Sequence, residues 1–206
     1  MHVIKSILIL IFVALIDSPV SAADETPVPR TATTATTEHE PFIRQAFELA
    51  IRAGKKGNHP FGALLVHQGK VILTAENTVN TDNNVAHHAE INLLTMAKRD
   101  IPPDVLREST MYTSTAPCMF CCAAMWFQNI KKVVYGVSYE TFAKLTGFED
   151  HGLHCDQLYR ETGKQLGFIG PVLEEEGLKV FCHWPQDAFR AALIKQLDRL
   201  GVPGCQ

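Results

Sequence analysis

The sequence lacks the features of a nucleic-acid-binding protein, a membrane-spanning protein and a repeat protein. Its 19 Lys and Arg residues are outnumbered by 22 Asp and Glu residues, and basic residues occur only in isolated pairs such as Lys55-Lys56 and Lys131-Lys132. A long polyanionic partner needs a basic patch and is therefore disfavoured, although a small anionic ligand is not. The chain has no internal repeat, and no apolar run reaches the roughly 20 residues that a transmembrane helix needs.

The N-terminus has the pattern of an export signal. Lys5 precedes an apolar run over residues 7–16, and Val20-Ser21-Ala22 matches a small-x-small cleavage site. Residues 1–22 are therefore predicted to be a signal peptide, with an uncleaved anchor or a buried strand as the alternatives. The mature protein is then expected in the periplasm or outside the cell.

The rest of the chain divides into a short leader and one domain. Residues 23–37 are rich in Thr, Pro and Ala, bury too little apolar surface to fold, and are predicted to be disordered. Residues 38–206 remain, and with 46% of the chain hydrophobic this length suits one domain with a full core better than two small ones.

Helical and strand patterns alternate through the first part of that domain. Phe42, Ala46, Leu49 and Ala50 recur at helical spacing, which predicts an amphipathic first helix. The same reasoning predicts further helices at 86–98 and 118–128, and strands at 61–67, 71–75, 110–114 and 133–137. This alternation indicates an α/β domain with helices on both sides of a central sheet.

The C-terminal third has a weaker pattern. We expect a short helix at 140–145, an irregular loop at 147–155, a strand at 178–181 and a helix at 187–200. In the last helix, the residues expected to face inward are Ala188, Ala191, Ala192 and Leu193.

Two short motifs carry the chemistry of the chain, His88-Ala89-Glu90 and Pro117-Cys118-Met119-Phe120-Cys121. Both are predicted to begin helices, where the positive end of the helix dipole lowers the pKa of a thiol. One imidazole and two thiolates give three ligands for tetrahedral Zn²⁺ and leave the fourth position to water, as in catalytic zinc sites. We therefore predict one Zn²⁺ per chain, held by His88, Cys118 and Cys121, with Glu90 as the catalytic acid and base.

The four remaining cysteines lie in a chain predicted to reach an oxidising compartment, where disulfides persist. Cys155, Cys182 and Cys205 are better candidates for pairing than Cys122, which follows a predicted ligand on an apolar helix. The connectivity stays open at this point.

His-x-Glu followed by Pro-Cys-x-x-Cys is the signature of zinc-dependent nucleobase deaminases. On these motifs, residues 58–136 resemble the cytidine and deoxycytidylate deaminase superfamily. Pro60-Phe61-Gly62-Ala63 and Val133-Val134-Tyr135-Gly136 are similar to the branch that contains guanine deaminases, bacterial nucleoside deaminases and tRNA adenosine deaminases. The resemblance implies a three-layer α/β/α fold with a mixed central sheet of about five strands, and it implies a homodimer.

The resemblance also implies a substrate pocket. Asn77 occupies the place of a substrate-contacting asparagine in this branch. The backbone N–H of Ala89 and the side chain of Phe61 match positions that line the base pocket. Phe127 matches an aromatic position near the base in guanine deaminases.

Several of these residues also have a structural interpretation. A Cys-x-x-Cys pair can be a redox pair, and Glu90 can stabilise a helix start, but the complete signature favours zinc and catalysis. A ligand at His87 would break the His-x-Glu spacing, so His87 is expected to cap the helix or to support the ligand. Asn77 can serve turn formation alone. On base rates, the residues more often found in a core than on a ligand platform are Phe61, Trp126 and Phe127.

The predicted function is hydrolytic deamination of a small nucleobase or nucleoside, with a guanine-type purine favoured. A cytosine- or adenosine-type substrate, a nucleic-acid base, and a non-catalytic zinc-stabilised envelope domain are the alternatives. Two departures from the branch, Asn84-Val85-Ala86-His87 in place of Asp-Pro-Thr-Ala and Ala116 in place of Glu, leave every ligand intact. Both lie beside the pocket and affect substrate identity.

Overall fold

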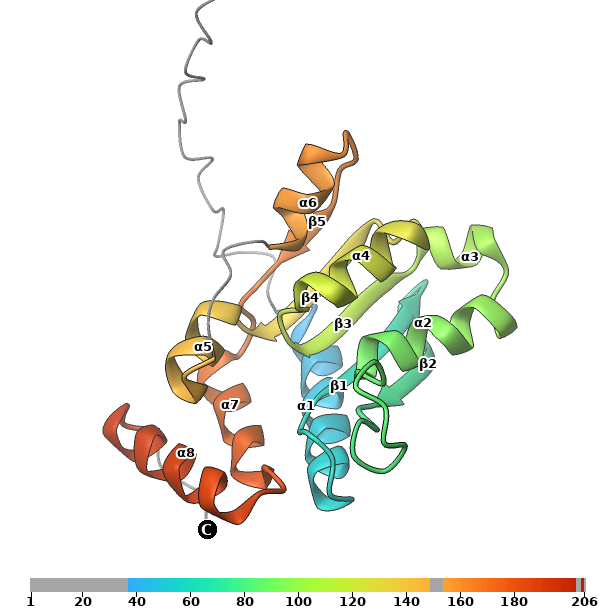
Figure 1. Cartoon of the computed structure of the whole chain (residues 1–206). Helices are drawn as coiled ribbons and strands as arrows, with labels where there is room; N and C mark the ends of the chain where they lie inside the picture. The colour runs from blue at the N-terminus through green and yellow to red at the C-terminus, as the bar shows by residue number, and fades with distance from the viewer. Residues whose placement is uncertain (1–36, 149–153, 203–204, 206) are drawn as a thin grey trace, which may run out of the picture. The chain divides into compact units, whose positions relative to one another are not determined.

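Five strands form one sheet in the order β2-β1-β3-β4-β5. β1 pairs antiparallel with β2 and with β3, whereas β3, β4 and β5 run parallel, so the sheet is mixed (Figure 1). The computed structural model describes residues 37–148, 154–202 and 205. Its strands are β1 (Gly62–His67), β2 (Lys70–Glu76), β3 (Thr110–Thr115), β4 (Lys132–Val137) and β5 (Gly167–Ile169).

Helices precede, connect and follow the strands. They are α1 (Glu40–Lys55), α2 (Ala89–Asp100), α3 (Pro103–Glu108), α4 (Met119–Phe127), α5 (Tyr139–Thr146), α6 (Cys155–Glu161), α7 (Glu174–Leu178), the 3₁₀ helix η1 (Lys179–His183) and α8 (Asp187–Arg199). Within the described part of the chain, no helix is long and apolar enough to cross a membrane. The predicted signal peptide and leader, residues 1–22 and 23–37, lie outside the described residues except for Thr37.

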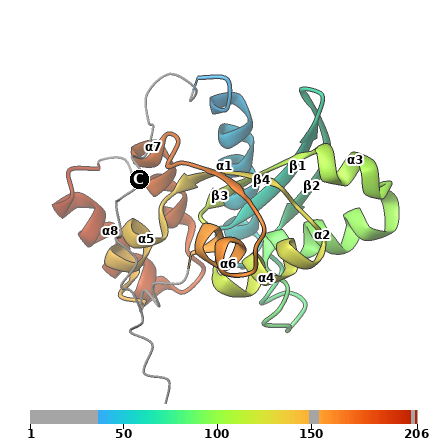
Figure 2. The same ribbon diagram turned by 90° about the horizontal axis from the view of Figure 1, so that it is seen from above.

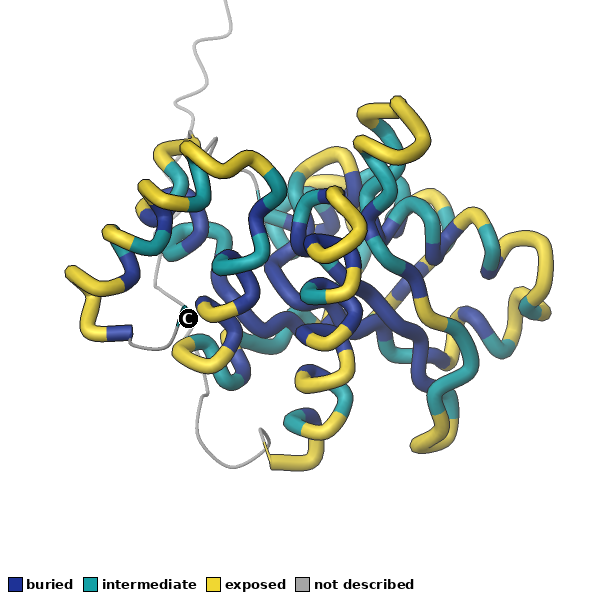
Figure 3. The backbone as a smooth tube through the Cα atoms, turned by 90° about the horizontal axis from the view of Figure 1, so that it is seen from below, coloured by how far each residue is buried: buried dark blue, intermediate teal, exposed yellow. Residues whose placement is uncertain are grey.

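Alternate residues of the strands face two separate apolar layers, as the period of a β-strand requires. Leu64 and Val66 of β1 pack with the buried face of α1, whereas Ala63 and Leu65 pack with residues of α2 and α4. Figure 2 shows α1 on one side of the sheet and α2 and α4 on the other, and Figure 3 shows that the buried parts of the backbone are concentrated in the interior. The predicted three-layer α/β/α fold with a mixed sheet is confirmed.

The start of β1 lies directly against α1. A Cβ atom at Gly62 would come within 2.4 Å of Leu49 Cβ and 2.5 Å of Ala46 O, so a larger residue does not fit without movement of α1. This close approach fixes the backbone next to Phe61, the residue predicted to line the substrate pocket.

The helix predicted at 86–98 begins three residues later, at Ala89. The residues before it are held outside the helix, because Thr78 N donates to His87 O (3.0 Å) and Ala86 N donates to Asn84 Oδ1 (2.9 Å). His88 therefore occupies the N-cap position of α2 instead of lying within its first turn.

The predictions for the C-terminal third were partly wrong. Residues 178–181 are helical, because α7 ends at Leu178 and η1 follows; a short apolar run does not distinguish a strand from a buried helix. α3, α6, β5 and α7 were not predicted, and residues 149–153 of the predicted irregular loop lie outside the described residues.

The inward face of α8 also differs from the prediction. Leu193 is buried as expected, and Leu197, four residues further on, is buried with it. Three alanines predicted to face inward are exposed, because larger side chains gain more from burial and set the orientation of the helix: Ala188, Ala191 and Ala192.

Two disulfides join the four cysteines outside the metal motif, Cys122–Cys155 and Cys182–Cys205. The ranking of Cys122 as the poorest candidate was wrong. Successive residues of a helix point about 100° apart, so Cys122 faces away from the direction of Cys121 and towards α6. Proximity to a ligand along the chain therefore did not prevent pairing.

Candidate active site and metal centre

One edge of the sheet gathers the residues predicted for the site. β1 begins after Phe61 and β2 ends before Asn77, and Asn77 N donates to Phe61 O (3.0 Å). β3 ends close by, since Gly62 N donates to Ser114 Oγ (3.1 Å). The turn that carries Cys118 therefore starts beside Phe61 and Asn77.

His88 and Cys118 occupy the N-cap positions of α2 and α4. Their backbones are extended (ψ of 155° and 166°), and neither side chain makes a capping hydrogen bond. An N-cap side chain ordinarily turns back to accept a hydrogen bond from a free backbone N–H. These two side chains are instead directed to a common point, together with Cys121, which lies in the first turn of α4 and is fully buried.

The three side chains have the spacing of a tetrahedral zinc site. Cys118 Sγ and Cys121 Sγ lie 3.7 Å apart, and His88 Nδ1 lies 3.7 Å from the first and 3.5 Å from the second. Zn–S bonds of about 2.3 Å and Zn–N bonds of about 2.0–2.1 Å at tetrahedral angles would put the sulfurs about 3.8 Å apart and each about 3.6 Å from the nitrogen. The donor set and its geometry therefore fit Zn²⁺.

The ligands perturb each other's protonation. The neighbouring Cys121 thiol, together with the His88 ring, lowers the pKa of Cys118 to about 4. Contact with Cys118 and burial raise the pKa of Cys121, and contact with Cys118 raises the pKa of His88. One sulfur is thus a thiolate at neutral pH, and the other would lose its proton on coordination to Zn²⁺.

Glu90 is next to the ligands but is not one of them. Its Oε2 lies 3.7 Å from Cys121 Sγ, yet in the described chain only His88, Cys118 and Cys121 bring their ligand atoms within 4.8 Å of one another. Burial raises the pKa of Glu90 to about 7, and the negative charge of Cys118 adds to the rise. A carboxyl group that titrates near neutrality is suited to both accept and donate a proton.

Two N–H groups are available to a ligand: the side-chain amide of Asn77 and the backbone N–H of Ala89. Asn77 is 1% exposed; its Oδ1 accepts from Val79 N (3.1 Å), while its Nδ2 has no hydrogen-bond partner within the described residues. Ala89 is the buried first residue of α2, a position whose N–H has no partner inside the helix. An unpaired buried donor is costly, so both donors suit a substrate with acceptor atoms.

Phe61 lies in an aromatic cluster that is built largely from the C-terminal third. Its ring is edge-on to Phe181 (6.2 Å between centroids) and to Trp184 (6.0 Å). His59 stacks on Trp184 at 5.0 Å, and burial, with the charge of His88, lowers the pKa of His59. Neither Trp184 nor His59 was predicted; the one signal in the sequence was the place of His59 two residues before Phe61.

Phe127 is not brought together with the other site residues in the single chain. It is the last residue of α4, about 12 Å along the helix axis from the ligand-bearing start. Its side chain is 79% exposed and meets the ring of Trp126 edge-on. A role for Phe127 in substrate binding stays a prediction.

The side chain of His87 contacts loop residues, and a role in supporting the ligand stays a prediction. Its Nδ1 lies 2.7 Å from Asp82 Oδ2 and its Nε2 lies 2.9 Å from Asn84 Nδ2. The ring is therefore held by the loop before α2, and the neighbouring His88 is left for the metal.

An open three-ligand zinc geometry, a buried carboxyl group beside it and unpaired donors at one sheet edge define the class of zinc-dependent deaminases. Residues 36–137 match the family model described as the cytidine and deoxycytidylate deaminase zinc-binding region. The chain is also 34% identical over 148 residues to a probable cytosine deaminase of Schizosaccharomyces pombe. The aligned region covers 66% of this chain and 86% of that protein. The chain belongs to the cytidine and deoxycytidylate deaminase family.

Other relatives in this family carry different names. The chain is 35% identical over 129 residues to the guanine deaminase of Bacillus subtilis (61% of this chain, 78% of that protein). A tRNA-specific adenosine deaminase of Buchnera aphidicola is 39% identical over 103 residues (50% and 68%). The solved structure of the B. subtilis guanine deaminase superposes with a TM-score of 0.50 at 28% identity, covering 67% of this chain and 88% of that one. These relatives are deaminases, and the protein is an enzyme of the hydrolytic deaminase class.

Proposed function

We propose that the protein uses one Zn²⁺ per chain to deaminate a small nucleobase or nucleoside, with a guanine-type purine as the preferred substrate. The observation that carries the proposal is the Glu90 carboxyl group, buried 3.7 Å from Cys121 beside a ligand set with an open fourth position. A buried carboxyl group with a pKa of about 7 is the acid–base group that exchange of an amino group for oxygen needs.

Each residue of the proposed site has its own role in the reaction. Bound Zn²⁺ supplies Lewis-acid chemistry that makes water nucleophilic at neutral pH. Glu90 takes the two protons of the attacking water in turn and gives one to the ring nitrogen of the base and the other to the leaving amino nitrogen. A C–O bond forms, the C–N bond breaks, ammonia departs and the base keeps a carbonyl oxygen. The N–H groups of Asn77 and Ala89 orient the base.

The aromatic cluster supports a purine over a pyrimidine. Phe61 and His59 are both partly exposed and form an aromatic wall backed by Trp184, which is 3% exposed, and the charge of His88 affects His59. A two-ring base covers more of such a wall than a one-ring base and gains more from burial. The cytosine deaminase relative keeps cytosine as the runner-up.

A substrate screen tests this assignment. Ammonia release by the zinc-loaded protein is measured with guanine, cytosine, adenine, adenosine and cytidine under one set of conditions. We expect the highest kcat/KM for guanine. A higher value for cytosine would replace the purine assignment with the runner-up, and no release from any of these compounds would contradict the proposed function.

A change at Asn77 tests the predicted substrate contact. Asn77→Asp keeps the Oδ1 atom that accepts from Val79 N and removes the unpaired Nδ2 donor. We expect kcat/KM to fall by about 10- to 100-fold, the effect of leaving one buried polar partner unpaired. Asn80→Asp, in the same loop but bonded to Gly57 O, is the matched control. Equal kcat/KM for the two variants would remove Asn77 from the substrate site.

A nucleic-acid base is the less favoured substrate, although some relatives are tRNA deaminases. Phosphate contacts need Lys and Arg, and the chain has a net charge of −3 with no basic cluster. A non-catalytic zinc domain would normally close its site with a fourth protein ligand. The described residues offer only three ligands, which supports the enzyme.

We also propose that the protein acts outside the cytoplasm. The predicted signal over residues 1–22 is supported by two disulfides, which form and persist in oxidising compartments. Expression of the full chain in a host with a secretion pathway is expected to yield a periplasmic or secreted product that starts at Ala23. An intact N-terminus in the cytoplasmic fraction would contradict this.

We also propose that the protein is a homodimer. α4 is apolar all round, and its outer face exposes Met119 (45%), Phe120 (49%) and Phe127 (79%). A helix of this kind is ordinarily buried, and a second copy of the chain would cover it. Light scattering is expected to report twice the chain mass for the wild type and one chain mass for Phe120→Glu. A monomeric wild type would contradict the proposal.

A further inference from the structure

We infer that the Cys122–Cys155 disulfide is a positioning element of the zinc site, whose loss weakens zinc binding more than it weakens the fold. It holds the turn that carries Cys118 and Cys121 against α6. The inference rests on the zinc part of the proposed function and is independent of the substrate.

The disulfide lies directly beneath the ligand-bearing turn. Cys122 follows the ligand Cys121, and Cys122 and Cys155 are 1% and 0% exposed. Their sulfurs lie 3.4 Å and 3.9 Å from the carbonyl oxygen of Pro117, the residue before the ligand Cys118. The bridge therefore contacts the turn on both sides of the two ligands.

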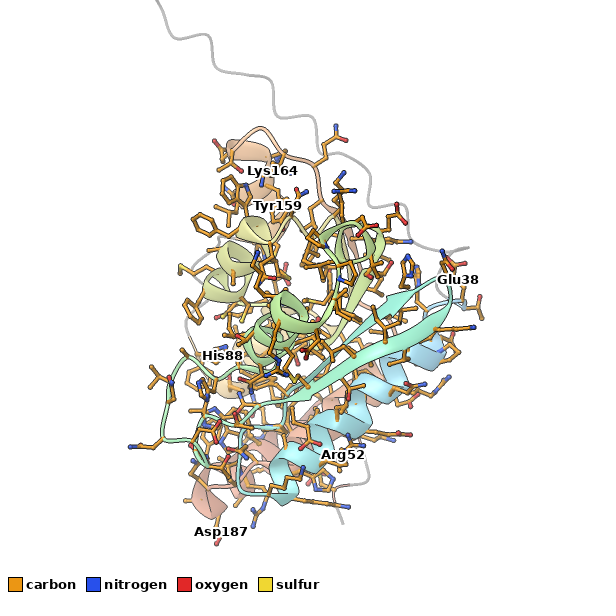
Figure 4. The ribbon with its side chains drawn as sticks, turned by 90° about the vertical axis from the view of Figure 1, so that its right-hand side faces the viewer. Glu38, Arg52, His88, Tyr159, Lys164 and Asp187 are labelled. Carbon is orange, nitrogen blue, oxygen red and sulfur yellow. A yellow bond between two sulfur atoms is a disulfide. The ribbon has the colours of Figure 1, made fainter. Side chains whose placement is uncertain are left out.

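The α6 segment, which the disulfide joins to the start of α4, also contacts the other end of α4. Trp126 Nε1 donates to Thr162 Oγ1 (2.7 Å), and Lys164 Nζ donates to Trp126 O (3.0 Å) and lies 3.7 Å from the Trp126 ring centroid. Figure 4 shows Tyr159 and Lys164 together on this segment, and Lys164 N donates to Tyr159 O (2.8 Å). α4 is thus tied to the α6 segment covalently at its ligand-bearing start and by polar contacts at its distant end.

The two attachments have separable consequences. Without the disulfide, the contacts at Trp126 and the burial of Tyr159 (1% exposed) still hold α6 on α4. The start of α4 loses its covalent anchor, and its N-cap residue Cys118 makes no capping hydrogen bond that would compensate. The ligand turn then has to be ordered when zinc binds, and this ordering cost appears as lost affinity.

The second disulfide is a matched control for effects on the unfolded chain. Cys122–Cys155 and Cys182–Cys205 span 33 and 23 residues, and the chain entropy that a disulfide removes depends only on the logarithm of loop length. Loss of either bridge therefore destabilises the fold to a similar degree. Cys182–Cys205 joins η1 to the end of the chain and carries no ligand neighbour.

The test compares four proteins: the wild type, C122A/C155A, C182A/C205A and Thr162→Val, which loosens the distant attachment. Zinc affinity is measured by competition with a chromophoric chelator, and thermal unfolding is recorded for the same samples. We expect C122A/C155A to lose about 10- to 100-fold in zinc affinity, the usual effect of removing a partner of a metal ligand. The other two variants should stay within about twofold of the wild type, because they leave the ligand turn anchored. Equal zinc affinity in the two disulfide variants would overturn the inference.

A second measurement covers the case in which C122A/C155A does not fold. In C182A/C205A only one disulfide remains, and a phosphine with water reduces it to two thiols while the phosphine is oxidised. After removal of the phosphine, zinc dissociation into a chelator is expected to accelerate about tenfold, and an unchanged rate would overturn the inference. Both measurements need no substrate, so a failed search for deaminase activity leaves them intact.

Discussion

Glu90→Gln is expected to bind zinc as tightly as the wild type. Its rate of ammonia release should be at least about 1,000-fold lower. Glutamine keeps the size of the side chain and fits the same buried space beside Cys121, but it has no group that takes a proton from water. Zinc content by mass spectrometry and kcat from ammonia release, measured on the same preparation, check both halves of the expectation.

Glu161→Gln is the control for this change, because Glu161 is an exposed glutamate at the end of α6. Its kcat should match the wild type. Full turnover by Glu90→Gln would remove Glu90 from the mechanism. Loss of zinc from Glu90→Gln would instead give the carboxyl group a place in the metal site.

Phe181→Ala is expected to lower the free energy of unfolding by about 3–5 kcal/mol, the range for truncation of a buried aromatic side chain. Phe181 is 0% exposed, and its ring contacts those of Phe61, Phe142 and Trp184. The measurement is denaturant unfolding of the two proteins under one condition. The Phe61 ring packs against the Phe181 ring, and Phe61 is predicted to line the substrate pocket. We therefore expect kcat/KM to fall as well.

Val85→Ala provides the comparison for the stability change. Val85 is 85% exposed and lies outside the proposed dimer face, so the free energy of unfolding should move by no more than about 0.5 kcal/mol. A loss at Phe181 no larger than that at Val85 would show that the C-terminal third does not form the aromatic cluster.

The first part of the fold could be predicted because its signals are local. Helical spacing of apolar residues placed α1, and the alternation of strand and helix patterns placed β1 to β4 with α2 and α4 between them. Turn and cap chemistry then fixed their ends to within a few residues. The largest shift, at the start of α2, came from a hydrogen bond between Thr78 and His87 that no local pattern reveals.

The C-terminal third could not be predicted in the same way. Residues 178–181 are apolar enough for a strand or a helix, and α1, against which they pack, lies more than a hundred residues earlier in the chain. The pairing of Cys122 with Cys155 could not be predicted for the same reason. The bridge depends on where α6 packs and not on spacing along the chain.

The cluster of His88, Cys118 and Cys121 with Glu90 beside it could be predicted, because the His-x-Glu and Pro-Cys-x-x-Cys spacings are tied to two helix starts. Asn77 was predicted by resemblance, and its buried, unpaired Nδ2 gives that prediction a physical reason. The wall formed by Trp184 and His59 was missed, since it exists only once the C-terminal segment has folded onto the site.

The proposed deamination of a small base depends on one zinc ion held by His88, Cys118 and Cys121. Zn²⁺ is titrated back into chelator-treated protein, and ammonia release is followed with the best substrate from the screen. We expect no turnover without zinc and a rise in rate that levels off at one ion per chain. Turnover that persists without zinc, or zinc that binds without restoring turnover, would contradict the proposed zinc-dependent reaction.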